Sequence, residues 1–205
     1  LSLAAPLRRR KCSVTSTPAT MTPSSPTILE QRLALDASGA GARTLLRSLP
    51  KEDSDLHIAH KADGSLVSDA DMMSQQAIMA ILDGSKLPVL SEESAAPSHK
   101  DRKDWARYWL VDPLDGTESF LRSRSGFAVN IALCDETGPI YGVVADPLAN
   151  RMYHGGIGCP VQISPLDGTH TRQIHPSAIQ RPYRLVTSWM EQANIPELVP
   201  PHVDP

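Results

Sequence analysis

Two aspartates separated by two residues follow an apolar run in the middle of the chain. Asp112 and Asp115 belong to the string W-L-V-D-P-L-D-G-T-E-S-F, residues 109–120. A buried-type strand over 108–111 would deliver Asp112 to its end, where Pro113 turns the chain, so both carboxylates can converge on one point. Neighbouring carboxylates repel each other and are costly to bury, which makes a hard cation their natural partner.

The same string offers further oxygen ligands and a phosphate site. Magnesium prefers one or two protein carboxylates together with water and substrate phosphate, and the carbonyl of Leu114 is directed into the same space. Gly116 and Thr117 follow at the expected start of a helix, where backbone N–H groups can hold a phosphate oxygen. The string therefore predicts adjoining metal and phosphate sites, and a self-stabilising acidic turn is the alternative.

Two more carboxylates stand at the ends of other expected elements. Glu92 follows a short apolar strand over 88–90, and Asp71 lies in the first turn of a helix that Ser68 can cap. Either one alone is typical of a cap or a surface carboxylate. With Asp112 and Asp115 they form a set of four, which suits two or more metal ions about 3.5–4 Å apart.

Four strings of the chain resemble the inositol monophosphatase superfamily. They are K-A-D-G-S-L-V-S-D-A-D (61–71), L-P-V-L-S-E-E-S (87–94), Y-W-L-V-D-P-L-D-G-T-E-S-F (108–120) and F-A-V-N-I-A-L (127–133). Within the superfamily they look most like the bacterial-type 3′(2′),5′-bisphosphate nucleotidases. The likeness runs from about residue 28 to 153, and more weakly to 188.

The resemblance implies a phosphatase, that is, a hydrolase of phosphate monoesters. It would convert adenosine 3′,5′-bisphosphate to AMP and phosphate through a metal-activated water, a reaction of nucleotide and sulfur metabolism. Its partner would be a small phosphorylated substrate, and its cofactor Mg²⁺, with two or three ions in the complete family site. A homodimer is compatible with the resemblance.

The resemblance also assigns roles to individual residues. The implied metal ligands are the side chains of Glu92, Asp112 and Asp115 and the carbonyl of Leu114. Asp71 and Thr117 look like the catalytic pair that orients and deprotonates the attacking water. The implied substrate-binding residues are Gly116, Thr117, Glu92 and Lys61, the last adding a positive charge.

The chain departs from the family beyond this region. Family members continue into a second α/β half with a W-D-x-A-A-G motif, whose aspartate completes the second metal site, and no W-D pair occurs here. We therefore expect an N-terminal half whose C-terminal half is missing. An inositol monophosphatase and a catalytically silent, truncated fragment that retains metal or phosphate binding stay open as alternatives.

Periodicity and turn residues predict the elements that position these side chains. The expected elements are helices over 28–49 and 69–82, strands over 88–90 and 108–111, a hairpin over 126–134 and 139–144, and an edge strand over 151–154, followed by turns. Two early helices and a mixed, largely antiparallel sheet predict an α/β (α+β) layered sandwich of the sugar-phosphatase type, with both helices on one face.

Composition limits the class of protein. A net charge of -3 provides no basic excess for a nucleic acid polymer, and the lack of a run of about 18 apolar residues argues against a membrane span. Three widely spaced cysteines indicate free thiols and a cytoplasmic location. The basic, acid-poor stretch before Glu30 is either an organelle transit peptide, for a chloroplast or mitochondrion, or read-through before a start at Met21.

These patterns predict three segments. Residues 1–26 are expected to be disordered, transit-like or read-through sequence. Residues 27–188 would form the metal- and phosphate-binding α/β domain, and 189–205 a proline-rich truncated tail.

Several features resemble sites without being expected to act as such. P-L-D-G-T recurs at 165–169, but Ser164 precedes it where Asp112 precedes the first copy, so it predicts a hairpin turn. Asp146 and Pro147 likewise predict the end of a strand. His154, His170, His175 and His202 lack metal-ligand spacing and are expected at the surface or in turns.

Overall fold

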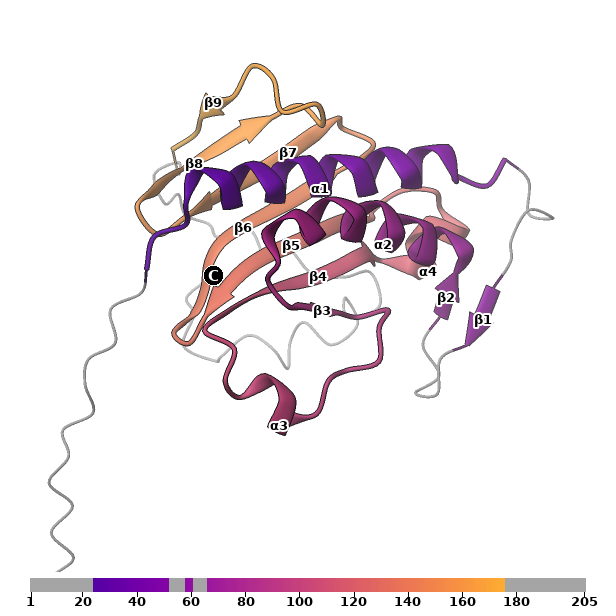
Figure 1. The fold of residues 1–205 in the computed structure, drawn as a ribbon. Helices are drawn as coiled ribbons and strands as arrows, with labels where there is room; N and C mark the ends of the chain where they lie inside the picture. Colours follow the sequence, from indigo (N-terminus) through magenta and orange to yellow (C-terminus); the bar gives the residue numbers. More distant parts are fainter. Residues whose placement is uncertain (1–23, 52–57, 61–65, 176–205) are drawn as a thin grey trace, which may run out of the picture. The chain divides into compact units, whose positions relative to one another are not determined.

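A seven-stranded sheet organises the computed structural model, which describes residues 24–51, 58–60 and 66–175 (Figure 1). The strands are β3 (Val89–Ser91), β4 (Arg107–Asp115), β5 (Ala128–Asp135), β6 (Gly138–Asp146), β7 (Arg151–Gly156), β8 (Cys159–Ser164) and β9 (Arg172–Gln173). They lie side by side in that order. Only the β3–β4 pair is parallel among these seven, so the expected mixed, largely antiparallel sheet is confirmed.

The first helix, α1 (Ile28–Arg47), begins at a capping box. The Thr27 side chain accepts the N–H of Glu30, and the Glu30 carboxylate accepts the N–H of Thr27. Glu30 also pairs with Arg107 at the start of β4, with 2.7 Å between Nη1 and Oε1. The beginning of α1 is thereby fastened to the sheet that the helix covers.

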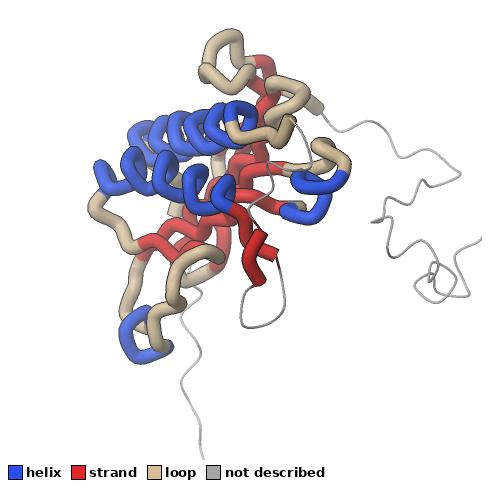
Figure 2. The backbone as a smooth tube through the Cα atoms, turned by 90° about the vertical axis from the view of Figure 1, so that its right-hand side faces the viewer, coloured by secondary structure: helices blue, strands red, loops and turns tan. Residues whose placement is uncertain are grey.

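The second helix, α2 (Asp69–Leu82), packs beside α1, and both lie on the same side of the sheet, as Figure 2 shows. Small residues permit the close approach. A Cβ on Gly41 would lie 2.8 Å from the Ile78 side chain of α2, and one on Gly39 would collide with the Leu166 carbonyl oxygen in the turn after β8, so glycine also lets α1 approach that turn. The helix-covered face expected from the sequence is therefore confirmed.

The core lies between these helices and the sheet. Trp109, Val111, Ile131 and Val143 point to the helices and are at most 2% exposed. Because strand side chains alternate, the residues between them point to the opposite face. Helices α1 and α2 contact only the first face.

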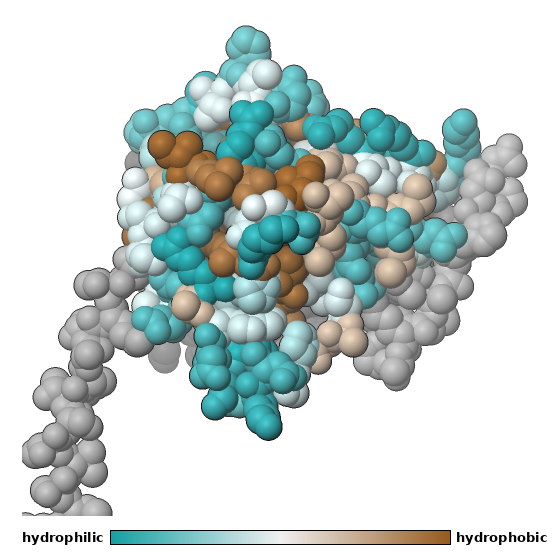
Figure 3. All heavy atoms as spheres, in the orientation of Figure 1, coloured by the Kyte–Doolittle hydropathy of each residue, from teal (hydrophilic) through white to brown (hydrophobic). Residues whose placement is uncertain are grey.

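Smaller elements complete the described structure. They are the two-stranded sheet of β1 (Ile58–His60) and β2 (Leu66–Ser68), the 3₁₀ turn η2 (Asp83–Ser85), and the short helices α3 (His99–Arg102) and α4 (Thr117–Arg122). Helix α3 forms a hydrophilic protrusion in Figure 3. The described helices include none that is long and apolar enough to cross a membrane.

Some elements differ from the sequence expectations. Strand β4 does not end before Asp112 but continues to Asp115 through an irregularity that accommodates Pro113. The segment 151–154 is not an edge, because β8 and β9 extend the sheet beyond β7. Strand β9 is two polar residues long and has no apolar alternation to detect, whereas β8 alternates Cys159, Val161 and Ile163 but contains Pro160, which argues against a strand. Helix α3 was not among the expected elements.

His154 is the clearest correction. It was expected at the surface or in a turn, but it lies on β7 facing the helices and is 4% exposed. The Tyr141 hydroxyl lies 3.0 Å from its Nδ1, and Ser164 Oγ lies 3.3 Å from its Nε2. Burial lowers the pKa of His154. Two cross-strand hydroxyl partners allow a neutral imidazole to be buried.

The chain divides into two units. Residues 1–173 form the first, which contains all the elements above. Residues 174–205 form the second, of which 174 and 175 are described. The predicted boundary at 188 falls outside the described residues, as do Met21, Cys12 and His202, whereas the boundary after residue 26 is described and lies just before Thr27, the N-cap of α1.

Candidate functional site

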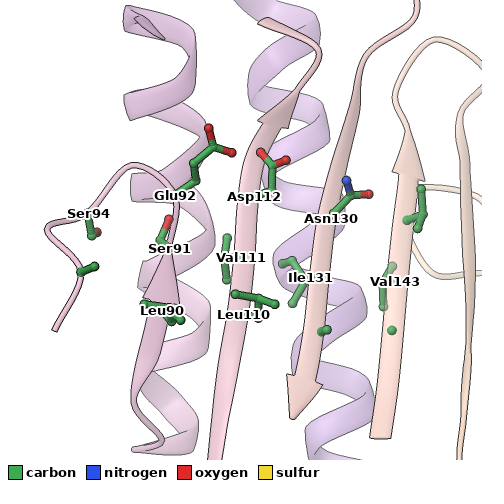
Figure 4. Close-up of a pocket in the computed structure, with 14 residues that line it drawn as sticks. Leu90, Ser91, Glu92, Ser94, Leu110, Val111, Asp112, Asn130, Ile131 and Val143 are labelled. Atoms are coloured by element: carbon green, nitrogen blue, oxygen red, sulfur yellow. The ribbon is translucent and has the colours of Figure 1, made fainter. Parts of the chain in front are cut away.

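Parallel pairing of β3 with β4 brings two acidic side chains to the same edge of the sheet. Glu92 directly follows β3, and its N–H donates to the Val111 carbonyl of β4 over 3.1 Å. Asp112 is the next residue of β4. Figure 4 shows the Glu92 and Asp112 carboxylates side by side above their strands, with Asn130 of β5 beyond them. The parallel register therefore places the two predicted ligands together.

Asp112 is held in an environment that disfavours its charge. Burial, together with the negative charges of Glu92 and Asp115, raises its pKa to about 7. The N–H of Leu114 opposes this by donating to Asp112 Oδ1 over 3.2 Å. A carboxyl group that is destabilised by neighbouring carboxylates is a group that a cation would stabilise.

Asp115 reaches the site through an irregularity in β4. Asp112 pairs with Asn130 and Asp115 pairs with Ala128, so two residues of β4 are accommodated as a bulge between the pairs. The Asn130 amide donates to Asp115 Oδ2 over 3.0 Å. Sequence reasoning did not single out Asn130, although a polar amide within the apolar run F-A-V-N-I-A-L was the available signal.

The carboxylates are near each other without forming a closed metal cluster. Among the described residues, no group of three or more His, Cys, Asp or Glu side chains lies close enough together to hold an ion. Glu92 and Asp112 are adjacent, while Asp115 is turned to Asn130. The donor set still fits magnesium, which needs few protein carboxylates and retains water and phosphate.

Asp71 and Thr117 are brought together from α2 and α4. Thr117 Oγ1 lies 3.1 Å from Asp71 Oδ1 and 3.3 Å from the Leu114 carbonyl. Asp71 is fully buried, and its Oδ2 accepts the N–H of Ser68 over 2.8 Å and the Ser68 hydroxyl over 2.6 Å. The predicted water-activating pair is thus in hydrogen-bond contact and rigidly oriented.

The turn between β4 and α4 requires glycine. Gly116 has a φ of 88°, and a Cβ there would lie 2.9 Å from the Gly126 carbonyl oxygen. Ser74 of α2 donates to the Pro113 carbonyl over 2.8 Å, which fastens the turn to the helix layer. The glycine-dependent turn and the Ser74 hydrogen bond together fix the backbone around Leu114 and Thr117.

An apolar cavity of about 560 Å³ adjoins the acidic side chains (Figure 4). Leu90, Leu110 and Val144 are among the residues that line it, with Glu92 and Asp112 at one end. It lies on the face opposite α1 and α2.

Residues 29–193 match the model of the inositol monophosphatase family, which is most of the chain. The chain belongs to this family. It is 45% identical over 108 residues to the 3′(2′),5′-bisphosphate nucleotidase CysQ of Escherichia coli K12, and 36% identical over 101 residues to the Haemophilus influenzae enzyme of the same name. The resemblance seen in the four sequence strings is confirmed.

Solved structures agree with this membership. CysQ from Bacteroides thetaiotaomicron, described as a member of the same family, superposes with a TM-score of 0.62 at 28% identity, covering 82% of this chain and 67% of that one. The protein SuhB of Bartonella henselae superposes with a TM-score of 0.62 at 27% identity, covering 74% of this chain and 55% of that one. The predicted fold class is confirmed.

The matches with the curated relatives cover only part of each protein. The alignment with the E. coli enzyme spans 50% of this chain and 42% of the relative, and that with the H. influenzae enzyme spans 48% and 38%. The chain therefore matches less than half the length of these relatives.

Other sequence features can now be placed. Lys61 lies outside the described residues. The second P-L-D-G-T forms a turn between β8 and β9, with the Gly168 N–H donating to the Pro165 carbonyl and Asp167 accepting from Thr169. Asp146 ends β6, as expected. Cys134 and Cys159 are free thiols.

Proposed function

We propose that this chain carries the metal- and phosphate-binding site of a magnesium-dependent phosphatase acting on a nucleotide 3′(2′),5′-bisphosphate. The observation that supports this most is the position of the Thr117 hydroxyl, which lies 3.1 Å from the Asp71 carboxylate and 3.3 Å from the Leu114 carbonyl. The Thr117 hydroxyl thus connects the buried Asp71 carboxylate, the proposed general base, to the loop that carries Asp112 and Asp115.

The proposed ligands of Mg²⁺ are the side chains of Glu92, Asp112 and Asp115 and the carbonyl of Leu114. When bound, the ion would supply positive charge that offsets the carboxylate repulsion and draws electrons from the phosphoryl group. The raised pKa of Asp112 supports a cation at this position, because burial and the charges of Glu92 and Asp115 together produce it.

Asp71 is the proposed proton acceptor. Thr117 Oγ1 donates to Asp71 Oδ1, so its oxygen lone pairs remain to accept a proton from a water on the phosphate side. The proton would pass from water to Thr117 as the threonine proton moves to Asp71. Ser68 holds the other carboxylate oxygen and keeps Asp71 in the required orientation. General base catalysis of this kind contributes about 10²–10⁴-fold in rate.

The phosphate would be held at the start of α4. The backbone N–H groups of Gly116 and Thr117 are the proposed donors, because the first N–H groups of a helix have no partner within it. Gly116 adopts a left-handed backbone conformation, which turns the chain at the point where these N–H groups lie. Glu92 would contact the substrate through the shared metal, and Lys61 is proposed to add positive charge.

A phosphate-release assay tests the proposal. The chain of 205 residues, with Mg²⁺, is offered adenosine 3′,5′-bisphosphate and inositol 1-phosphate. We expect release from the nucleotide, and a loss of about 10²-fold or more in kcat for Asp71→Asn and Thr117→Val. Thr117→Ser should retain most activity because it keeps the hydroxyl.

Asp83→Asn is the matched control, because Asp83 is an exposed carboxylate that pairs with Lys86 outside the site. An Asp71→Asn variant as active as the wild type would contradict the proposed base. Preferred turnover of inositol 1-phosphate would favour the inositol monophosphatase alternative. Mg²⁺ binding without any phosphate release would identify a silent fragment.

A further inference from the structure

Three polar side chains of α2 reach the segments that carry the acidic side chains. Asp71, Ser74 and Gln75 share one face of the helix, because residues three and four positions apart are neighbours on a helix surface. Asp71 contacts Thr117 at the start of α4 over 3.1 Å, and Ser74 donates to the Pro113 carbonyl over 2.8 Å. Gln75 instead reaches the end of β3, where Glu92 lies.

The amide oxygen of Gln75 contacts both ends of the turn that carries Glu92. It accepts the Ser91 hydroxyl over 2.5 Å and lies 3.4 Å from the Ser94 hydroxyl. The Ser94 N–H also donates to the Ser91 carbonyl over 3.2 Å, which closes the turn over 91–94. Ser91, Glu92 and Ser94 can be followed along this turn in Figure 4. A single side chain of α2 thus fastens the turn at its first and last residues.

Ser91 and Glu92 point to opposite sides of the sheet, as neighbouring residues of a strand do. Ser91 faces α2 and is 5% exposed, whereas Glu92 is exposed and lies beside Asp112. The hydrogen bond from Ser91 to Gln75 therefore supports the turn from the side of the helix. Gln75 can fix the position of Glu92 without contacting the ion that Glu92 is proposed to bind.

The turn needs this support because Glu92 and Asp112 carry charges of the same sign. Figure 4 shows the two carboxylates side by side, and like charges at short range repel each other. Repulsion favours an outward movement of the exposed turn. The loop of Asp112 is held by Ser74 at Pro113, so adjacent residues of α2 fix the two loops relative to each other.

We propose that Gln75 is a positioning residue that sets the location of Glu92 relative to Asp112 by holding the turn over 91–94. The inference rests on the proposed function for the identity of the ion that the two carboxylates share. Residues that orient metal ligands in this way change metal affinity about 10- to 100-fold when they are replaced.

Calorimetric titration of Mg²⁺ into the full chain, well below the unfolding midpoint of each variant, tests this role. Gln75→Met keeps the length and helix propensity of the side chain but replaces the amide oxygen with a thioether sulfur, a weak acceptor. It should weaken Mg²⁺ binding about 10-fold or more. Gln75→Glu keeps an acceptor oxygen at the same reach and should bind Mg²⁺ at least as tightly as the wild type.

Gln76→Met is the matched control, because Gln76 is the same residue type, adjoins Gln75 on α2 and is exposed. It should leave Mg²⁺ binding unchanged. Ser91→Ala removes the other partner of the hydrogen bond and should weaken Mg²⁺ binding to a similar degree as Gln75→Met. The double variant should bind Mg²⁺ no more weakly than the weaker single variant, because both changes break the same contact.

The Mg²⁺ dependence of phosphate release provides a second readout, which a purely structural role would not change. With the bisphosphate as substrate, Gln75→Met should need about 10-fold more Mg²⁺ for half-maximal release. Its kcat at saturating Mg²⁺ should stay close to that of the wild type, because excess ion compensates for weaker binding.

The outcomes separate this inference from the proposed function. The positioning role is overturned if Gln75→Met and Ser91→Ala lower the unfolding midpoint but bind Mg²⁺ like the wild type, or if Gln76→Met or Gln75→Glu weakens binding equally. Mg²⁺ binding that depends on Gln75, without phosphate release, would support the positioning role and contradict the enzyme. Phosphate release whose Mg²⁺ requirement is unchanged in Gln75→Met would do the reverse. A wild type that does not bind Mg²⁺ would overturn both.

Discussion

Adjacent residues of β4 occupy opposite environments: Trp109 points to α1 and α2 and is fully buried, whereas Leu110 points away from them and is 42% exposed. The same contrast runs across the sheet, with Ile131 and Val143 on the covered face and Val144 and Tyr153 on the other. The covered face is closely packed by helices whose small residues allow direct contact. The other face carries cavities that end at the acidic side chains.

This difference separates what stabilises the fold from what is proposed to do chemistry. The covered face follows the general rule that a sheet buries one side against helices. Exposed apolar side chains such as Leu110, Val144 and Tyr153 gather on the second face, and a contiguous apolar surface of this kind marks a site of interaction.

The largest expected effect compares the two neighbours on β4. Trp109→Ala should lower the free energy of unfolding by about 3–5 kcal/mol, because it leaves a large cavity and removes the Nε1 hydrogen bond to Ser85. Leu110→Ala should change it by only about 0.5 kcal/mol. Urea denaturation measures both. An equally large loss for Leu110→Ala would show that something covers the second face in solution.

A matched pair of glycines provides the next test. Gly39→Ala should cost about 1–3 kcal/mol by overpacking, since its Cβ would lie 2.3 Å from the Leu166 carbonyl oxygen. Gly142→Ala on the uncovered face should be nearly neutral, because nothing lies within 4 Å of its Cβ. Thermal unfolding of both variants checks this. A neutral Gly39→Ala would indicate that α1 is less closely packed than the structure shows.

The smallest expected effect is a pH dependence that arises on the covered face. Burial lowers the pKa of His154 below its ordinary value of 6.5, so the unfolded chain binds a proton that the folded chain does not. Stability from this residue should be complete above about pH 6.5 and should decrease as the pH falls below it. Urea midpoints measured across this range should decrease less in His154→Gln.

The exposed His170 provides the control for that experiment. His170→Gln should retain the wild-type pH dependence. If His154→Gln shows the same dependence as the wild type, the slope comes from other groups and not from the buried imidazole.

Sequence alone predicted the elements whose patterns are local. Both long helices follow from apolar periodicity, and the second also from the cap at Ser68, whereas the capping box at Thr27 was not predicted. The β5–β6 hairpin follows from two apolar runs around a short turn. The two-residue β9 offers no such pattern, and the burial of His154 depends on Tyr141 and Ser164 from neighbouring strands. Long-range pairing of that kind leaves no local signal.

The site was predictable to a similar extent. The strand-end carboxylates Glu92 and Asp112 and the carboxylate of Asp71 in a capped helix were visible in the sequence. The structure places Glu92 and Asp112 side by side and Asp71 in hydrogen-bond contact with Thr117. The sequence did not predict that β4 continues to Asp115 or that Asp115 contacts Asn130, because both features depend on the register of β4 with β5. The assigned roles of these residues remain predictions.

The response of stability to Mg²⁺ in the wild type and in Asp112→Asn tests the central claim most directly. Without Mg²⁺ the variant should unfold at the same temperature as the wild type or higher, because it loses the repulsion from Glu92 and Asp115. With Mg²⁺ at about 100 times its dissociation constant, the wild type alone should gain about 2.7 kcal/mol. Equal stabilisation of both proteins, or of neither, would contradict a metal site at Asp112.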